Sequence, residues 1–294
     1  MRIIETIESY NSKKISKQEY IDAMYNFHIH LFDYTKVIPH TDIKKIEIVD
    51  NKIIFTSRKS GIKLSCQKPD KRIAPIEVLN FNYYEKENSD MIFRLIEQEF
   101  NVFDIGANVG WYTLNIAKQF DKTNILAFEP IPSTFDQLKQ NVKINSLNNI
   151  KIYNFGFSNQ DAEMTFYLEP ESSVSASAAN ITNKSDVGKV TCRVKRLDEF
   201  VNDYGIIPDF IKCDVEGAEL YVYQGGIETI RRYKPIIFTE MLRKWSAKFN
   251  YHPNQIIDLL SNSGYKCFVV KDNYLSEIHK MNDDTLETNF FFYI

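Results

Sequence analysis

The sequence predicts an α/β fold: a seven-stranded, mostly parallel sheet with helices on both faces, preceded by a small N-terminal appendage of helix and β-hairpin. From residue 100 onward, strand-like runs alternate with segments of helical periodicity, which is typical of a parallel sheet covered on both faces. The 294 residues include 44% hydrophobic and 26% charged side chains, enough for one large core and a smaller addition. We expect the appendage at 1–78 and the main domain at 79–294.

The appendage shows two patterns in succession. Ser16 with Glu19 three residues later is a capping-box signature, and apolar residues then recur at helical spacing, so a helix is predicted over 16–38. Residues 45–66 consist of short β-branched runs interrupted by turn signals such as Asp50-Asn51, which predicts a small β-meander. Such an appendage is a natural place for the contacts of a homodimer or for a lid.

The elements of the main domain follow in alternation. Strands are expected at 101–106, 124–130, 150–155, 209–215, 235–241, 265–271 and 288–294. Helices are expected at about 86–99, 110–119, 133–146, 218–231 and 253–262. Residues 156–196 interrupt this order as a long non-helical insertion with strand signals of its own. A long insertion in an α/β sheet is often functional, although a plain surface loop is also consistent with it.

Composition excludes several classes of function. The net charge of −3 provides no basic field, so nucleic acid is not an expected partner. Four cysteines without C-x-x-C spacing argue against a disulfide framework or a zinc knuckle. No apolar run approaches the roughly 20 residues of a membrane span, and the N-terminus is too polar for a signal peptide. We therefore expect a cytoplasmic protein.

The stretch VFDIGANVGWYT, which begins at Val102, predicts a ligand-binding turn. In an open α/β sheet, ligands bind beyond the carboxyl ends of the strands, and glycines there let the backbone approach the ligand. The dinucleotide fingerprint G-x-G-x-x-G would need a glycine where Asn108 follows Gly106, so a nicotinamide dinucleotide is disfavoured. ATP is disfavoured too, because the lysine of a phosphate-binding loop is missing. The acid Asp104 ahead of the glycines suits a cationic ligand better than a phosphate.

Two further strand ends carry acidic residues. The next strand ends at Glu129, whose carboxylate can accept hydrogen bonds from both hydroxyls of a ribose, although it can also simply cap the following helix. The strand after the insertion ends at Lys212 and Asp214, which alternation places on one face, and Glu216 follows in the turn. Charges at a strand end are costly unless they are paired or used, so this is either a site or a salt-bridged helix cap.

Together, the motifs D-I-G-A-N-x-G, F-E-P and I-K-x-D-V-E-G-x-E resemble the FkbM family of methyltransferases over about residues 80–294. The resemblance implies a class I methyltransferase (Rossmann-like) fold and S-adenosyl-L-methionine as cofactor. It also implies O-methylation of a small-molecule acceptor, a sugar or nucleotide-linked sugar, as in glycan or capsule biosynthesis. Alternatives are another acceptor, such as a lipid, a polyketide or a phosphorus-containing group, and a non-catalytic S-adenosylmethionine-binding module. Intact motifs disfavour the last of these.

The resemblance also implies the residues of the site. Those expected at the cofactor are Glu85, Asp104, Gly106, Ala107, Asn108, Gly110, Trp111, Tyr112, Thr113, Glu129, Pro130, Ser158 and Asp214, although Trp111 and Tyr112 could serve helix packing equally well. Asp214 is the preferred general base and Glu216 the second choice. Lys212 could keep a carboxylate ionised or stabilise an alkoxide, and Glu240 could join the cluster. Asp214, Glu216 and Glu240 could hold Mg²⁺, which the resemblance does not require.

Overall fold

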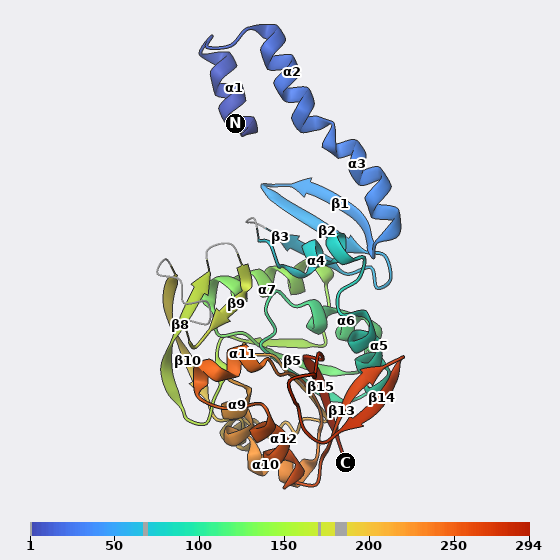
Figure 1. The fold of residues 1–294 in the computed structure, drawn as a ribbon, viewed down its shortest axis with the longest axis vertical. Coiled ribbons are helices and arrows are strands. Elements are labelled where there is room, and N and C mark those ends of the chain that lie inside the picture. The colour runs from blue at the N-terminus through green and yellow to red at the C-terminus, as the bar shows by residue number, and fades with distance from the viewer. Residues whose placement is uncertain (1, 67–69, 170–171, 180–186) are drawn as a thin grey trace.

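The structure is a computed structural model that describes residues 2–66, 70–169, 172–179 and 187–294. Within these ranges the chain forms an eight-stranded sheet with helices around it, a four-stranded sheet beside it, and a three-stranded sheet that carries a helical arm (Figure 1). The large sheet has the strand order β14-β13-β15-β12-β11-β4-β5-β6. Strands β4 and β11 are neighbours at its centre, where the strand order reverses, and this is where an open α/β sheet binds its ligand.

The large sheet contains all seven expected strands and one more. Five of them run parallel: β4 Asn101–Ile105, β5 Asn124–Phe128, β6 Ile150–Tyr153, β11 Phe210–Cys213 and β12 Ile236–Glu240. Antiparallel pairing adds β15 Asn289–Tyr293, β13 Lys266–Lys271 and β14 Tyr274–Ile278. The strand count of seven is therefore corrected to eight, because β14 folds back on β13 through Asp272 and Asn273, both with positive φ.

Helices cover both faces of this sheet, as expected. One face packs against α5 Lys86–Leu95, α6 Trp111–Gln119 and α7 Pro132–Asn145. The other packs against α8 Leu197–Tyr204, α9 Glu219–Gly225, α10 Ile227–Tyr233 and α12 Asn254–Ser261. Strand alternation divides the core accordingly, so Val102 faces the first group while Phe103 and Ile105 face the second.

Four details of the helix prediction are corrected. Helix α5 ends at Leu95, four residues before the expected end. The helix expected over 218–231 is interrupted at Gly226 and forms α9 and α10. Helix α8 was not predicted. The short α11 Arg243–Ser246 and the 3-10 turn η2 Ala247–Phe249, which follow β12, were not predicted either.

The insertion forms a sheet of its own, as its strand signals indicated. Its strands are β7 Gly156–Phe157, β8 Ala162–Glu169, β9 Ser172–Ser177 and β10 Gly188–Lys195, in the order β7-β10-β8-β9. Phe166, Cys192 and Val194 pack against Ile131, the N-cap residue that precedes α7. The insertion is thereby held next to the carboxyl end of β5.

The N-terminal region consists of α1 Ile3–Asn11, α2 Lys17–His28, α3 His30–Val37, η1 Ile38–His40, β1 Ile43–Val49, β2 Lys52–Ser57, β3 Lys63–Cys66 and α4 Ala74–Phe81. The predicted capping box is present: Ser16 Oγ accepts from Glu19 N at 3.2 Å, and Ser16 N donates to Glu19 Oε2 at 2.7 Å. The β-meander is confirmed. The single helix expected over 16–38 is two helices that meet at Ile29, and α1 and α4 were not predicted.

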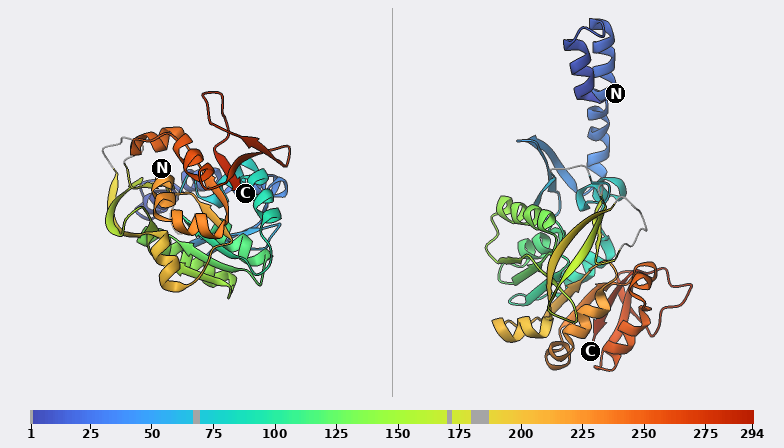
Figure 2. Two further views of the ribbon diagram at one scale, coloured as in Figure 1. Left: turned by 90° about the horizontal axis from the view of Figure 1, so that it is seen from below. Right: turned by 90° about the vertical axis from the view of Figure 1, so that its left-hand side faces the viewer.

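The meander is joined to the body, whereas the helical arm formed by α1, α2 and α3 stands clear of it (Figure 2, right). Ser65 N and Oγ donate to Asn141 Oδ1 of α7 at 2.9 and 3.0 Å. Ile62 and Leu64 share a buried cluster with Val109 of the glycine turn. By contrast, α2 and α3 bury none of their residues.

Cys66, Cys192, Cys213 and Cys267 are free thiols, in agreement with their spacing in the sequence. In the part of the chain that the structure describes, we find no helix whose length and apolar character would let it cross a membrane.

Candidate active site

A cavity of about 570 Å³ opens at the carboxyl ends of β4, β5, β11 and β12. This volume is ordinary for a site that binds a small molecule. The predicted residues that line it are Glu85, Gly106, Ala107, Asn108, Trp111, Tyr112, Glu129, Pro130, Ser158, Lys212, Asp214, Glu216 and Glu240. Three others, Asp104, Gly110 and Thr113, lie outside this lining. The fold therefore brings residues from four strand ends to one hollow.

The glycines of the turn stand where a side chain would collide with other parts of the protein. Gly106 has φ +75°, and a Cβ on it would lie 1.8 Å from the carbonyl oxygen of Asp214. Gly110 has φ +94°, and its Cβ would lie 2.6 Å from Leu138 Cδ1. Both distances are far below van der Waals contact. The absent side chains thus make room for other parts of the protein, and Gly106 lets the glycine turn touch the backbone of Asp214.

Asn108 is held at the edge of the cavity. It adopts a left-handed conformation (φ +50°), which Asn tolerates better than most residues. Its N–H donates to Glu129 Oε2 at 3.0 Å, and its side-chain oxygen is buried without a hydrogen-bond partner. Because buried acceptors in native proteins nearly always have a donor, this oxygen fits a cavity whose ligand supplies one.

Glu129 caps the following helix, which is one of the two interpretations that the sequence left open. It accepts from Asn108 N and from Ile131 N, at 3.0 and 2.9 Å, and so fixes both the glycine turn and the start of α7. Burial raises the pKa of its carboxyl to about 7. Each carboxylate oxygen has two lone pairs, so both oxygens can accept one more hydrogen bond from the cavity. This capacity fits a ribose.

Asp104 lies behind the cavity wall and contacts Lys212. Asp104 is fully buried; it accepts from Thr113 Oγ1 at 2.5 Å, and its Oδ1 lies 3.3 Å from Lys212 Nζ. Lys212 Nζ also donates to the Gly106 carbonyl at 2.7 Å and lies 3.6 Å from Asp214 Oδ2. Burial alone would lower the pKa of Lys212, but the charges of Asp104 and Asp214 outweigh it and raise the pKa. Asp104 thus acts on the cavity through Lys212.

Three carboxylates meet beyond the carboxyl ends of β11 and β12, on the side of the cavity that we call the acidic wall. Asp214, Glu216 and Glu240 have oxygens within 4.8 Å of one another, and they are a group that could hold a metal ion such as Mg²⁺. Asp214 Oδ1 is buried without a hydrogen-bond partner. Burial first, and then the charge of Asp214, raise the pKa of Glu216 and of Glu240 well above the ordinary value. Like charges so close disfavour full ionisation of the group, so its carboxyl groups can exchange a proton with a ligand.

The glycine turn and the acidic wall both lie within a segment that matches a known family. A model of the methyltransferase FkbM domain matches residues 104–267. The chain belongs to this family. The expected family is confirmed, and the sheet with helices on both faces is its class I methyltransferase architecture.

Individual relatives cover the chain only in part. It is 28% identical over 142 residues to methyltransferase 1 of Beauveria bassiana, which is 42% of this chain and 57% of that protein. It is 32% identical over 155 residues to hexuronic acid methyltransferase AglP of Haloferax volcanii, or 52% and 61% of the two chains. The chain thus spans less than two thirds of these two relatives. The solved structure of methyltransferase FkbM from Methylobacillus flagellatus is 18% identical, with a TM-score of 0.45 over 73% of this chain and 52% of that one.

Glu219, the last residue of the third FkbM motif, was missed as a site residue. It is buried behind the turn that carries the acidic group and accepts from Val215 N and Gly217 N at 3.1 and 3.0 Å. Tyr251 Oη donates to it at 3.2 Å. Burial raises its pKa to about 7. This carboxylate holds the turn in which Glu216 has a positive φ of 55°, and the final acid of the motif was the available signal.

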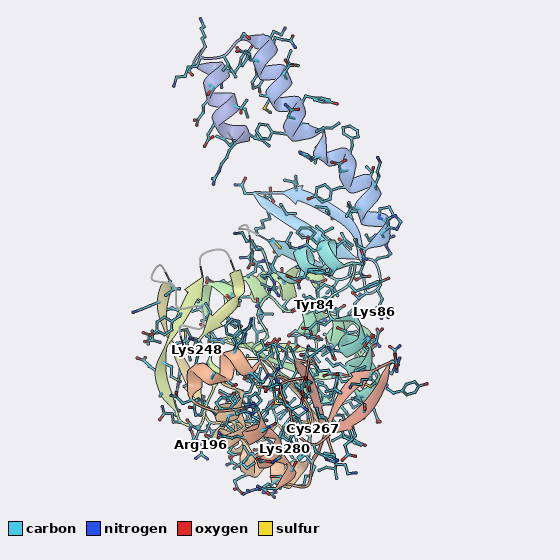
Figure 3. All side chains as sticks on the ribbon, in the orientation of Figure 1. Tyr84, Lys86, Arg196, Lys248, Cys267 and Lys280 are labelled. Carbon is cyan, nitrogen blue, oxygen red and sulfur yellow. The ribbon has the colours of Figure 1, made fainter. Side chains whose placement is uncertain are left out.

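Glu85 reaches the cavity from the segment that precedes α5. Tyr112 Oη donates to Glu85 Oε2 at 2.6 Å, and burial raises the pKa of Glu85. Tyr84, beside α6 in Figure 3, packs on Trp111 and Tyr112 with ring centroids 5.3 and 6.1 Å away. Trp111 and Tyr112 therefore serve both uses left open by the sequence, since they line the cavity and pack against neighbouring rings.

The outer rim of the cavity was not predicted. Its aromatic residues are Phe81, Tyr83, Tyr221 and Trp245. Two cations also line it: Arg72, whose Nε lies 2.5 Å from Glu77 Oε1, and Lys244, whose Nζ lies 4.2 Å from the centre of the Trp245 ring. These residues come mostly from α4, α11 and nearby turns, which the sequence did not reveal and the family motifs do not contain.

Proposed function

We propose that this FkbM-family chain is an S-adenosylmethionine-dependent O-methyltransferase that acts on a hydroxyl of a sugar or nucleotide-linked sugar. The observation that carries the proposal is the position of the acidic group, Asp214, Glu216 and Glu240, on the same cavity as the glycine turn and Glu129. One wall suits a nucleoside cofactor, and the other suits removal of a proton from an acceptor. When bound, S-adenosylmethionine supplies a methyl group on a cationic sulfur for in-line attack.

The cofactor wall offers acceptors that a nucleoside with an amino-acid tail can satisfy. Glu129 has spare lone pairs for ribose hydroxyls, and the buried side-chain oxygen of Asn108 lacks a donor. Pro130 and Ser158 line the adjoining part of the cavity, beside the inserted sheet. On the side nearer to α5, the buried carboxyl of Glu85 can face the ammonium of the tail. These positions support the roles that the family resemblance gives to the residues.

The acidic wall offers a general base. We assign this role to Asp214, because its Oδ1 is free to accept a proton while its Oδ2 faces the ammonium of Lys212 at 3.6 Å. With the cofactor bound, the acceptor hydroxyl would lose its proton to Asp214 as its oxygen bonds to the methyl carbon, and the methyl–sulfur bond would break to leave a neutral thioether. Lys212 stabilises the carboxylate before that transfer. Glu216 is the second choice of base, and its raised pKa and that of Glu240 allow either of them to take the proton onward.

The rim supports a sugar as the acceptor. Flat aromatic rings, here Phe81, Tyr83, Tyr221 and Trp245, present apolar faces that can cover the C–H face of a sugar ring. The relative AglP is named a hexuronic acid methyltransferase, and NoeI of Sinorhizobium fredii, 25% identical over 54% of this chain and 70% of its own length, is named a 2-O-methyltransferase. Lipid, polyketide or phosphorus-containing acceptors remain the alternative within enzymes, and a module that only binds S-adenosylmethionine is the alternative outside them.

The test combines binding with turnover. Calorimetry should show binding of S-adenosylmethionine and none of NAD. Transfer of a labelled methyl group should then be measured across a panel of free and nucleotide-linked sugars, with and without EDTA. We expect a methyl ether from at least one sugar; loss of turnover in EDTA would show that the acidic group needs Mg²⁺. Binding without transfer to any member would contradict the sugar proposal, and binding of NAD alone would contradict the methyltransferase proposal.

A further inference from the structure

In the helical arm, α2 and α3 form one long helix, and α1 packs against only one side of it. Helices α2 and α3 are nearly continuous, because Ile29 between them keeps helical angles (φ −57°, ψ −34°) and donates to the Tyr25 carbonyl at 2.9 Å. Neither helix buries a residue. Figure 3 shows their side chains standing away from the body. Isolated helices are only marginally stable in water, so a rod of this length calls for packing partners.

One side of this rod carries large apolar residues at helical spacing. Ile21, Tyr25 and Phe32 lie at i, i+4 and i+11, and their exposed fractions are 47%, 62% and 68%. We call this set the apolar stripe. Helix α1 packs on another side of α2, where Tyr10 stacks on Tyr20 with ring centroids 4.3 Å apart. At about 100° a residue, Tyr20 lies about 140° around the helix from Tyr25, so α1 leaves the apolar stripe open.

The charge of the arm indicates what kind of partner fits. Residues 2–40 contain five basic and five acidic side chains, a net charge of zero. Anionic membranes and nucleic acids recruit helices through an excess of Lys and Arg, which this arm lacks. An apolar surface with balanced charge instead fits another protein helix of similar character.

We propose that the apolar stripe joins two copies of this chain, with their α2–α3 rods antiparallel about a two-fold axis near residues 28 and 29. This register places Tyr25 of one copy against Phe32 of the second copy. It also brings Asp22 within one residue of the level of Lys36 of the second copy, on the same flank of the contact, and symmetry repeats the pair. Such self-complementarity is what an isologous interface requires, and the inference does not depend on the proposed function.

The test uses the intact chain and a reversal of charge. Sedimentation equilibrium should give twice the monomer mass of 34.4 kDa for the wild type. Asp22→Lys and Lys36→Asp should each weaken the dimer, on the order of tenfold in Kd, because each creates two like-charge contacts. The double variant Asp22→Lys/Lys36→Asp should restore the wild-type Kd. Phe32→Glu should give monomers, on the order of hundredfold weaker or more.

The matched control is Lys14→Glu, which reverses an exposed charge off the apolar stripe and should leave the mass unchanged. Circular dichroism verifies that the variants keep their helix content. An unfolded arm could not restore the wild-type Kd, so recovery of that Kd in the double variant is a second control for folding. A wild type that stays monomeric at 100 μM, about the weak end of specific self-association, would overturn the proposal. So would a double variant as weak as the single ones, or a monomer that binds lipid vesicles instead of itself.

Discussion

The two walls of the cavity differ in how their carboxylates are partnered. On the cofactor wall, Glu129 accepts hydrogen bonds from Asn108 and Ile131, so the protein has fixed its carboxylate before any ligand arrives. On the acidic wall, Asp214 keeps a buried oxygen without a donor, and Glu216 and Glu240 are crowded by its charge. The first wall therefore has a fixed shape into which a ligand can bind, whereas the carboxylates of the second wall can accept a proton.

The largest effect is expected from Asp214→Asn, which removes the proposed base but keeps the shape of the acidic wall. Turnover should fall by about 10²- to 10⁴-fold, the range for general-base catalysis, while the Kd for S-adenosylmethionine stays nearly unchanged. Single-turnover kinetics and calorimetry measure the two quantities. Glu199→Gln, an exposed carboxylate on α8, is the control and should behave as the wild type. Normal turnover in Asp214→Asn would show that Asp214 is not the base and would assign that role to Glu216.

The next effect concerns Lys212, whose ammonium contacts both the glycine turn and Asp214. Lys212→Met should lower the free energy of unfolding by about 3–5 kcal/mol, because Asp104 is left as an unpaired buried charge. The double variant Asp104→Asn/Lys212→Met removes that charge and should recover much of the loss. Urea denaturation at pH 7 measures both. A loss in Lys212→Met below about 1 kcal/mol would show that Asp104 does not depend on this lysine.

The third prediction concerns pH. Glu219 has its folded pKa raised from 4.5 to about 7, so the folded state binds its proton more tightly than the unfolded state does. Its contribution to stability is therefore fully present below about pH 4.5 and is lost as the pH rises through 7, by up to about 3 kcal/mol. Glu219→Gln should flatten the fall in unfolding free energy between pH 5 and 7.5, measured by denaturation at several pH values. An unchanged slope would contradict the burial effect.

The smallest effect is expected at the cofactor wall, where hydrogen bonds within the protein already hold the side chains in place. Glu129→Ala should weaken binding of S-adenosylmethionine by about 1–3 kcal/mol, the scale of charge-assisted hydrogen bonds. Glu129→Gln separates the loss of the charge from the loss of the hydrogen-bond acceptor, because glutamine keeps an oxygen for the backbone N–H groups but carries no charge. Calorimetry gives the Kd of each variant. Equal affinity in Glu129→Ala and wild type would remove the ribose role.

The division of the chain at residue 78 stays a prediction. We propose the methyltransferase domain at 79–294 and the appendage at 1–78. The appendage is not uniform, since Ser65 of its meander bonds to Asn141 of α7 while the helices of the arm bury almost nothing. We therefore propose different roles for its two parts: the meander supports the glycine turn, and the arm contacts a second copy.

Local signals explain which elements were found. The turn at Asp50 and Asn51 was predicted, and both residues have positive φ as such a hairpin requires. The same pair at Asp272 and Asn273 closes the β13–β14 hairpin, so the missed strand had a usable signal. The short helix α11, which carries Trp245 to the rim, has four residues and no side-chain cap, and sequence periodicity cannot identify an element of that length.

The sequence by itself determined the order of the seven predicted strands, the family, and the residue types at each strand end, because these depend on spacing within a few residues. Only the tertiary structure decided which charges meet. It placed β11 between β4 and β12, so that Lys212 bonds to the Gly106 carbonyl and Glu240 joins Asp214, while Asp104 lies behind the wall. Electrostatic interaction falls with distance through space, and positions far apart in the chain acquire that distance only from the packing of the sheet.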